Sequence, residues 1–425
     1  MDKQYIMGLL QKELVVAVGC TEPVAIALAA ATAKSYLKED IQKVEVFASG
    51  NVIKNAKSVG IPGTKSTGLD FAAALGIVAG DPTKQLEVLA NAKQKDEENA
   101  LRLISEKEVA VHLAQTSIKL YIEIKLQSEN ESSRVVISND HTNISLIEVN
   151  NHCVHEQNQV EKTDNDSDTT LEKHLTIDAI YDFVKEVDVS KLALVQKSID
   201  LNLAIGEEGL KGNVGLNVGK TIQENVKKGI LSDDLVSYAM SLASAGSDAR
   251  MAGSLSPVMA NSGSGNQGIA VTLPVVAVGL KLGVDNEKML RAVALSHLIT
   301  IHIKEKFGRL SALCGVTAAG MGASGAITYL LDGDVSQIKA AVQNTIGNVS
   351  GMICDGAKAG CAMKVSTCTN AAVQSAILAL NNQEIQSTDG FIHDDVEKSI
   401  ENFCRLGNEG TKETDKLVLK MMLEK

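Results

Sequence analysis

The sequence predicts an α+β protein, with an N-terminal helix and a small mixed α/β domain followed by a larger all-α domain. Between Val44 and Asn150, short runs of alternating apolar residues are typical of strands and stand beside a helical run, FAAALGIVAG. After His174, almost every apolar run follows the helical period. We therefore expect helices in 1–40 that pack on the helical domain, an α+β domain over 41–170 and an all-α domain over 171–425.

The first forty residues have a helical pattern that breaks at Gly19. Thr21 is expected as the N-cap of an Ala-rich second helix. Cys20 then lies at a helix N-terminus, where the helix dipole favours a thiolate over a thiol. A metal ligand or a nucleophile requires that thiolate.

Five runs have the alternation of strands, namely KVEVFAS, VAVHLAQ, KLYIEIKLQ, SRVVISND and ISLIEVN. The glycine-containing segment NVIKNAKSVGIPGTKSTG is expected as a loop, and the polar stretch that ends at Thr170 as a linker. Leu310 to Leu331 carries no charged residue and is long enough to cross a bilayer. Because Ala, Gly, Ser and Thr dominate it, we expect a buried helix pair there instead.

The composition excludes several classes of partner. Aromatic residues make up only 3% of the 425 and Trp is absent, so base-stacking surfaces for nucleic acid are not expected. The net charge of -11 disfavours attraction to phosphate backbones and anionic lipid. The N-terminal segment MDKQYIMGLLQKELVV lacks the pattern of a secretory signal. We expect a cytoplasmic protein that binds neither nucleic acid nor membrane.

Four of the seven cysteines stand among small residues. Cys20 lies in GCTEP, Cys314 in SALCGVTAAG, and Cys354 in MICDGAKAGC, with Cys361 seven residues further on. Gly and Ala neighbours leave room for an object several ångströms wide. The residues alone allow two interpretations, ligands to one iron–sulfur cluster or small buried thiols.

The other three cysteines carry no such context. Cys153 lies between His152 and His155, but adjacent positions rarely point at one ion, so we interpret it as an incidental thiol. Cys368 and Cys404 are expected as small buried apolar side chains. A disulfide framework is not expected, because the cytoplasm keeps thiols reduced.

A second cluster of candidates lies in SDARMAGSLSPVMANSGSGNQG. A Gly-Ser-Gly loop offers backbone N–H groups to an anion, and Asn and Gln bind a carboxylate or an ammonium in fixed geometry. An amino-acid substrate would suit this set, and a glycine turn between two helices is the alternative. The candidate substrate-binding residues are Asp248, Arg250, Ser262, Ser264, Asn266 and Gln267.

Four isolated residues complete the candidate set. Asn51 and Lys54 precede the IPGT turn, and Lys54 is either a partner for a substrate carboxylate or a solvated lysine at a strand end. His141 in NDHTNI is either a proton-transfer group or a structural histidine. Arg309, five residues before Cys314, is either a carboxylate partner beside the cluster or a surface arginine.

Several of these motifs together resemble the L-cysteine desulfidase family. They are GCTEPVAIALA, NVIKNAKSVGIPGT, DHTNI, SDARMAG, NSGSGNQGI, RLSALC and SGMICDGAKAGCAMKVS, and the resemblance runs from about residue 4 to residue 425. The helical part of that family is similar to that of iron–sulfur L-serine dehydratases.

The resemblance implies an enzyme that uses a non-redox 4Fe-4S cluster to convert L-cysteine and water into pyruvate, ammonia and sulfide. Cys20, Cys314 and Cys354 would hold the cluster, with Cys361 as the reserve ligand and one iron left open for substrate. No pyridoxal phosphate is expected. The catalytic base stays open, with His141 as the first candidate and Lys54 as the second.

Two alternatives to the cysteine desulfidase hypothesis stay open. One is a lyase of the same chemistry that acts on L-serine or another β-substituted amino acid. The other is a non-catalytic iron–sulfur sensor, whose Gly-Ser loop would bind an effector. The Ala- and Gly-rich helical half is in addition a candidate surface for a homodimer interface.

Overall fold

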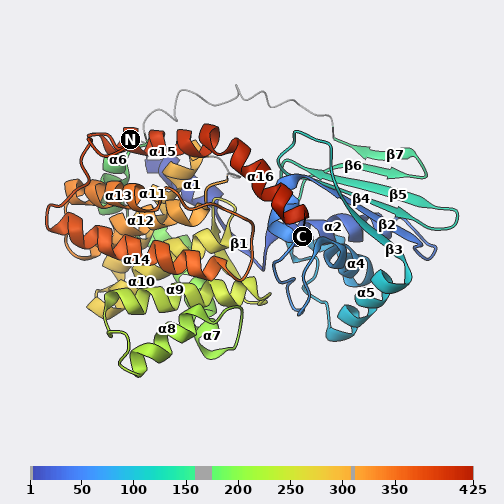
Figure 1. The fold of residues 1–425 in the computed structure, drawn as a ribbon, viewed down its shortest axis with the longest axis horizontal. Coiled ribbons are helices and arrows are strands. Elements are labelled where there is room, and N and C mark those ends of the chain that lie inside the picture. Colours follow the sequence, from blue (N-terminus) through green and yellow to red (C-terminus); the bar gives the residue numbers. More distant parts are fainter. Residues whose placement is uncertain (1–2, 158–174, 308–311, 425) are drawn as a thin grey trace.

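The computed structural model describes residues 3–157, 175–307 and 312–424. It has two parts, a large helical body and a smaller α/β part built on one sheet (Figure 1). This arrangement confirms the predicted α+β class. Each part has its own buried apolar core.

The α/β part is a mixed sheet with helices on one face. Within the described residues the strand order is β3-β2-β4-β5-β6-β7, with β2 parallel to β3 and every other pair antiparallel. Helices α2 and α4 pack together and against the strands. The elements are α2 (Thr21–Ser35), β2 (Lys43–Ala48), α3 (Gly50–Ala56), α4 (Leu69–Ala79), η1 (Pro82–Glu87), α5 (Gln94–Glu106), β3 (Glu108–Leu113), β4 (Tyr121–Gln127), β5 (Ser132–Ser138), β6 (Ile144–Val149) and β7 (His152–Glu156).

The five expected strands are all present, whereas two local expectations are wrong. The strands do not end near Asn150, because Asn150 and Asn151 take positive φ and turn the chain into β7, an exposed edge strand without apolar alternation. The NVIKNA segment is not a loop but helix α3, which buries Val52, Ile53 and Ala56 on one side.

The helices expected in residues 1–40 do not all pack on the helical body. Helix α1 (Lys3–Glu13) packs against helices of the body, and β1 (Leu14–Ala17) follows it directly. Helix α2 instead belongs to the α/β part, because its small side chains are buried between α4 and the sheet. Its N-cap position is Cys20 and not Thr21.

The helical body is built around three buried helices, α10, α11 and α12. Its elements after the sheet are α6 (Ile177–Glu186), η3 (Val189–Leu192), α7 (Ala193–Lys211), α8 (Val218–Lys227), α9 (Leu235–Met251), β8 (Val258–Asn261), α10 (Gly265–Leu282), α11 (Asn286–Phe307), α12 (Gly315–Leu330), α13 (Val335–Val349), α14 (Cys361–Leu380), α15 (Val396–Arg405) and the π-helical turn η4 (Leu406–Gly410).

Two apolar helices of the body bear on the question of a membrane span. Helix α12 is a single buried helix and not the expected pair. Among the described residues, α10 is the helix long and apolar enough to cross a membrane, and 83% of it is buried inside the protein. That degree of burial matches the core helix of a folded body.

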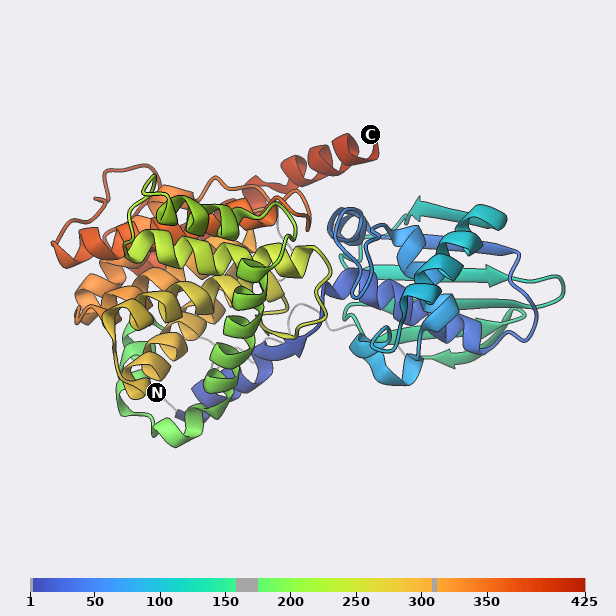
Figure 2. The ribbon, with the colours of Figure 1, turned by 90° about the horizontal axis from the view of Figure 1, so that it is seen from below.

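The two parts meet along a short seam. Gly60 N donates to Met251 O (3.0 Å) and Gly63 N donates to Gly253 O (3.0 Å), which ties the IPGT loop to the end of α9. At Gly60 a Cβ would overlap the Ala252 backbone, so only glycine permits this approach. Helix α16 (Lys412–Leu423) leaves the body and reaches toward the α/β part (Figures 1 and 2).

Candidate functional site

A cavity of about 560 Å³ lies between the two parts and is lined by residues from both. Its volume is in the range of about 300 to 1,000 Å³ that is usual for small-molecule sites. All four cysteines singled out in the sequence line it, together with most of the polar candidates: Cys20, Cys314, Cys354, Cys361, Asn51, Lys54, His141, Arg250, Ser262, Ser264, Asn266 and Gln267.

Three of the four cysteines stand at helix starts. Cys20 and Cys314 are the N-cap residues of α2 and α12, and Cys361 is the first residue of α14. The N-terminus of a helix carries partial positive charge from its unpaired N–H groups. Three helices therefore present the end that favours an anionic ligand to one cavity.

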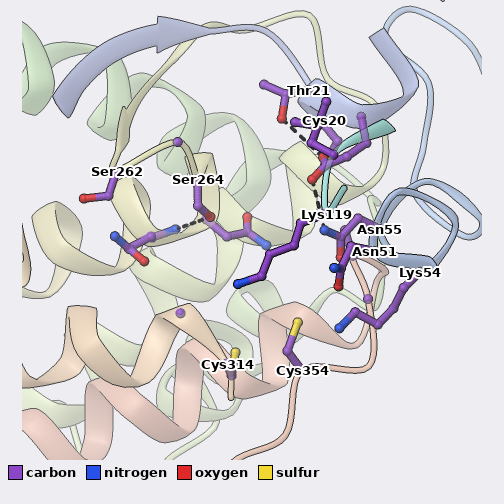
Figure 3. A pocket seen from close by; sticks show the side chains of 18 of the residues that line it. Cys20, Thr21, Asn51, Lys54, Asn55, Lys119, Ser262, Ser264, Cys314 and Cys354 are labelled. Atoms are coloured by element: carbon purple, nitrogen blue, oxygen red, sulfur yellow. Dashed lines mark hydrogen bonds between the residues drawn. The ribbon is translucent and has the colours of Figure 1, made fainter. Parts of the chain in front are cut away.

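Short backbone bonds hold Cys314 and Cys354 on neighbouring segments. Cys314 N donates to Met352 O (2.9 Å), and Cys354 N donates to Ala312 O (2.7 Å). Cys20 comes from the other part and packs in a small apolar cluster with Val59 and Met251, against which Cys361 also lies. Figure 3 shows Cys20 on one side of the cavity and Cys314 and Cys354 on the other.

The donor set suits a metal cluster better than a single ion. Within the described ranges, no three His, Cys, Asp or Glu side chains come close enough to hold one metal ion. A cluster is wider than an ion, and thiols are the donors that iron–sulfur clusters take. The four thiols, the small residues beside them and the helix N-termini fit such a group in chemistry and in charge.

Burial governs the protonation of these thiols in the protein alone. It raises the pKa of Cys20 to about 12 against the opposing charge of Arg250, and it raises the pKa of Cys314 to about 12 as well. The pKa of Cys361 is also raised by burial. In the protein without a metal, burial therefore favours the thiol at Cys20 over the thiolate that the helix dipole favours.

A carboxylate and an imidazole face each other beside Cys20. Glu22 Oε1 lies 3.8 Å from His141 Nε2 and accepts a hydrogen bond from Asn55 Nδ2 (3.0 Å). Burial alone would raise the pKa of Glu22, but the imidazole and the amide outweigh it and lower that pKa to about 2. His141 Nε2 is buried and makes no hydrogen bond among the described residues.

Three further buried polar atoms on the wall of the cavity are without partners in the described part of the chain. They are Arg250 Nε, Asn266 Oδ1 and Gln267 Oε1. Arg250 is anchored through Nη2, which donates to Gly19 O (2.8 Å), and Gln267 through Nε2, which donates to Asn261 Oδ1 (2.9 Å). Each of these residues therefore keeps one polar atom for a ligand, because a buried polar group without a bond is costly.

Comparison with known proteins places the chain in a family. Residues 83–420 match the model of the serine dehydratase alpha chain. The chain belongs to this family. A protein named UPF0597 from Oleidesulfovibrio alaskensis is 44% identical over 99% of this chain and 97% of its own. A protein of the same name from Parabacteroides distasonis is 40% identical over 100% of this chain and 98% of its own. Another from Aeromonas hydrophila is 42% identical over 98% of this chain and 95% of its own.

The stretch that matches the serine dehydratase alpha chain begins after several of the site residues. Cys314, Cys354, Cys361 and His141 lie inside residues 83–420, whereas Cys20 lies before them. The assignment of side chains from α2 and α3 to the site is therefore based on the geometry of the cavity and not on the family match.

Lys54 and Asn51 reach the cavity from helix α3. Lys54 is buried, with 3% of its side chain exposed, and its ammonium forms an ion pair with Asp415 of α16. The interpretation of Lys54 as a solvated lysine is therefore wrong. Figure 3 shows the Lys119 ammonium pointing into the space between Cys20 and the two cysteines of the body, and the Lys54 side chain directed toward Cys354 from the side of the cavity.

The two loop serines have mixed roles. Ser264 is the N-cap of α10, and its hydroxyl accepts a hydrogen bond from Gln267 N (3.3 Å). Ser262 takes a positive φ of 48° and donates to Asn261 Oδ1 (2.9 Å). Both line the cavity, but both hydroxyls also fix the loop, so they shape the site in this member of the serine dehydratase alpha chain family.

Asp248 departs from the prediction. It does not line the cavity, and its carboxylate accepts hydrogen bonds from Leu216 N (3.1 Å) and Gly219 N (3.1 Å) at the start of α8. Asp248 thus caps a helix, and its assignment to substrate binding is wrong. Arg309 lies outside the described residues.

Sequence reasoning did not select Glu22 or Lys119 as functional. In the sequence, Glu22 is recognisable only as an acidic residue in the first turn of α2. No nearby motif indicates its contact with His141. Lys119 lies in the β3–β4 loop, without a motif. The remaining cysteines, Cys153, Cys368 and Cys404, do not line the cavity.

Proposed function

We propose that this protein is an iron–sulfur lyase that eliminates sulfide from L-cysteine. The overall reaction converts L-cysteine and water into pyruvate, ammonia and hydrogen sulfide. One observation carries the proposal: a single cavity is lined by four thiols and by polar atoms that have no partner among the described residues, in a chain of the serine dehydratase alpha chain family. The resemblance of the motifs to L-cysteine desulfidases supports the choice of substrate.

The residues that would hold a 4Fe-4S cluster are Cys20, Cys314 and Cys354, with Cys361 as the reserve. When bound, such a cluster supplies a Lewis acid that stabilises negative charge on the leaving sulfur. Held by three thiols, the cluster would have one iron open for substrate. Cys361 Sγ contacts Gly356 O at 3.6 Å and lines the same wall, which makes it the fourth thiol to test.

The polar atoms of the cavity suit the two ends of an amino acid. Asn266 Oδ1 and Gln267 Oε1 are acceptors and would bind the substrate ammonium. Arg250 Nε and the Lys54 ammonium are donors and would bind the carboxylate. A site that pairs each charged end of the substrate orients the α-proton toward one wall.

The Glu22–His141 pair supplies the proton-transfer group. The imidazole of His141 would take the α-proton, and the C–S bond would break as the electron pair of the C–H bond forms the C=C bond. Glu22 stays ionised, because its pKa is lowered to about 2, and balances the imidazolium. Release of hydrosulfide leaves aminoacrylate, which water converts to pyruvate and ammonia.

L-Serine is the second candidate substrate, and the family description favours it. The same wall would bind its ammonium and carboxylate, and a hydroxyl would leave in place of the thiol. The two substrates differ only in the leaving atom, so direct assay separates them.

The test is anaerobic reconstitution with iron and sulfide, followed by sulfide and pyruvate assays on L-cysteine and on L-serine. Cys314→Ala is the site variant and Cys153→Ala, on the exposed β7, is the matched control. Equal amounts of sulfide and pyruvate from L-cysteine, lost in Cys314→Ala alone, support the proposal. Pyruvate from L-serine alone moves the assignment to a dehydratase. An assembled cluster with no turnover of either amino acid points to a sensor and contradicts the proposal.

A further inference from the structure

A second, smaller cavity adjoins the main one on its outer side. It has a volume of about 140 Å³ and shares part of its lining with the main cavity, including Asn51, Lys54 and Lys119. Its outer wall comes from helix α16 through Asp415, Lys416 and Leu419. Helix α16 therefore lies next to the candidate site and lines the smaller cavity beside it, although it follows the helical body in the chain.

Contacts with helix α3 hold α16 in this place. Leu419 packs on Gly50 so closely that a Cβ there would overlap its side chain. The Lys57 ammonium donates a hydrogen bond to the Met422 carbonyl. The Lys54 ammonium pairs with the Asp415 carboxylate. No described residue of α16 is fully buried, and the helix also contacts η4 at its start.

The ion pair between Lys54 and Asp415 is unequal in exposure. Only 3% of the Lys54 side chain is exposed, against 31% for Asp415. A buried ammonium is costly unless a carboxylate or several acceptors pair with it. Without Asp415, the Lys54 side chain would lower its energy by turning toward water, which takes its ammonium away from the main cavity.

We propose that Asp415 is a positioning residue that holds the Lys54 ammonium at the boundary of the two cavities, where it binds the carboxylate of the substrate. The inference rests on the proposed function in one respect only, the assignment of Lys54 to the substrate carboxylate. The structural part of the inference does not depend on the reaction. It states that contacts from α16 hold Lys54 and helix α3 in place. Nothing in the local sequence of α16 indicates such a role.

The kinetic test compares Asp415→Asn with Asp415→Glu and with Glu413→Gln in the full-length reconstituted protein. Glu413 is the matched control, because its carboxylate is exposed on the same helix and pairs only with Lys416 in the described contacts. Asp415→Asn is expected to raise KM about tenfold and to change kcat less than about twofold. Asp415→Glu should restore most of the affinity. An unchanged or lowered KM in Asp415→Asn overturns the proposal, since it would mean that Asp415 does not help or competes with substrate for Lys54.

Amide hydrogen exchange supplies a readout that does not depend on turnover. Loss of the ion pair should speed exchange across α3 in Asp415→Asn and leave it unchanged in Glu413→Gln. Unaltered exchange in Asp415→Asn would overturn the positioning role. If the native protein turns over neither amino acid, the proposed function fails, and the exchange result alone then decides whether Asp415 fixes Lys54.

Discussion

The helical body and the α/β part contribute different chemistry to the same cavity. The body supplies Cys314, Cys354 and Cys361, held by helix starts and short backbone bonds. The α/β part supplies one thiol, Cys20, together with titratable and charged side chains, of which His141 is the central one. Under the proposed function, the cluster ligands come from both parts and the proton acceptor comes from the α/β part alone, so that neither part holds a complete site.

The two parts also differ in how they are stabilised. Helices of the body pack through small residues, as where Gly209 of α7 lies directly against the Ala245 backbone of α9. The open face of the sheet instead carries ion pairs, such as Arg134 between Glu123 (2.7 Å) and Glu148 (2.8 Å). Because packing without gaps stabilises more than exposed charge does, we expect the largest effects of substitution in the body and at the cavity.

The largest change is expected from His141→Gln, which breaks the division of roles on the α/β side. Removal of the proton acceptor should lower kcat about 10²- to 10⁴-fold while the cluster still assembles. Steady-state kinetics and the visible absorption of the reconstituted protein measure the two quantities. His155→Gln, in the exposed strand β7, is the control. Equal loss of cluster and of activity in His141→Gln would show that His141 supports the cluster and does not act as the proton acceptor alone.

Gly209→Ala tests the close packing of the body. A Cβ at this position overlaps Ala245 O, so α7 and α9 must separate, and the free energy of unfolding should fall by about 1 to 3 kcal/mol. Gly8→Ala in α1 is the contrast, because a Cβ there meets nothing and should stabilise the protein by about 0.5 to 1 kcal/mol. Urea unfolding measures both, and a stable Gly209→Ala variant would contradict the packing account.

The pH dependence of stability should trace to His297 in the core of the body. Burial lowers the pKa of this imidazole from its ordinary 6.5 to about 3, so the folded protein keeps it neutral while the unfolded chain protonates it. Between pH 6.5 and pH 3 the unfolded state binds the extra proton, and stability therefore falls as pH falls. From pH 7 to pH 5 this contribution is about 2 kcal/mol.

His297→Gln isolates that contribution. The glutamine retains polar atoms for Ser198 and Asn261 but does not titrate. Urea unfolding at the two pH values should show a smaller loss of stability in the variant than in the native protein. The same loss in both would remove His297 as the source.

The smallest effect is expected on the open face of the sheet. Glu148→Gln removes one partner of Arg134, whose side chain is one-third exposed, and should cost less than about 1 kcal/mol of unfolding free energy. The cost should shrink further at high salt, because exposed charges are screened. A loss as large as that of Gly209→Ala would contradict the contrast between the parts.

The order of elements was predictable because it depends on local patterns. Alternating runs such as KVEVFAS became strands, and the cysteines singled out by their small neighbours, Cys314 and Cys354 among them, line one cavity. The local pattern failed where side chains far apart in the chain decide the structure. The sequence of α2 indicates an Ala-rich helix but not its packing partner, because the sheet on which it packs is formed by later parts of the chain.

The same limit applies to single side chains of the site. Asp248 has the chemistry of a substrate ligand, but a turn more than thirty residues away uses its carboxylate as a helix cap. Glu22 meets His141 across more than a hundred residues, and Lys54 meets Asp415 across most of the chain. Pairings of this kind depend on how the chain is folded back on itself, which the spacing of residues in the sequence does not predict.

In the proposed function, thiols from both parts of the molecule hold one cluster. The measurement is the iron and acid-labile sulfide bound per chain after anaerobic reconstitution of Cys20→Ala, Cys314→Ala and Cys153→Ala. We predict about four iron and four sulfide per chain for Cys153→Ala, as for the native protein, and a loss of most of both in Cys20→Ala as well as in Cys314→Ala. A Cys20→Ala protein that binds the full complement, with Cys314→Ala binding none, would place the cluster in the helical body alone and contradict the shared site.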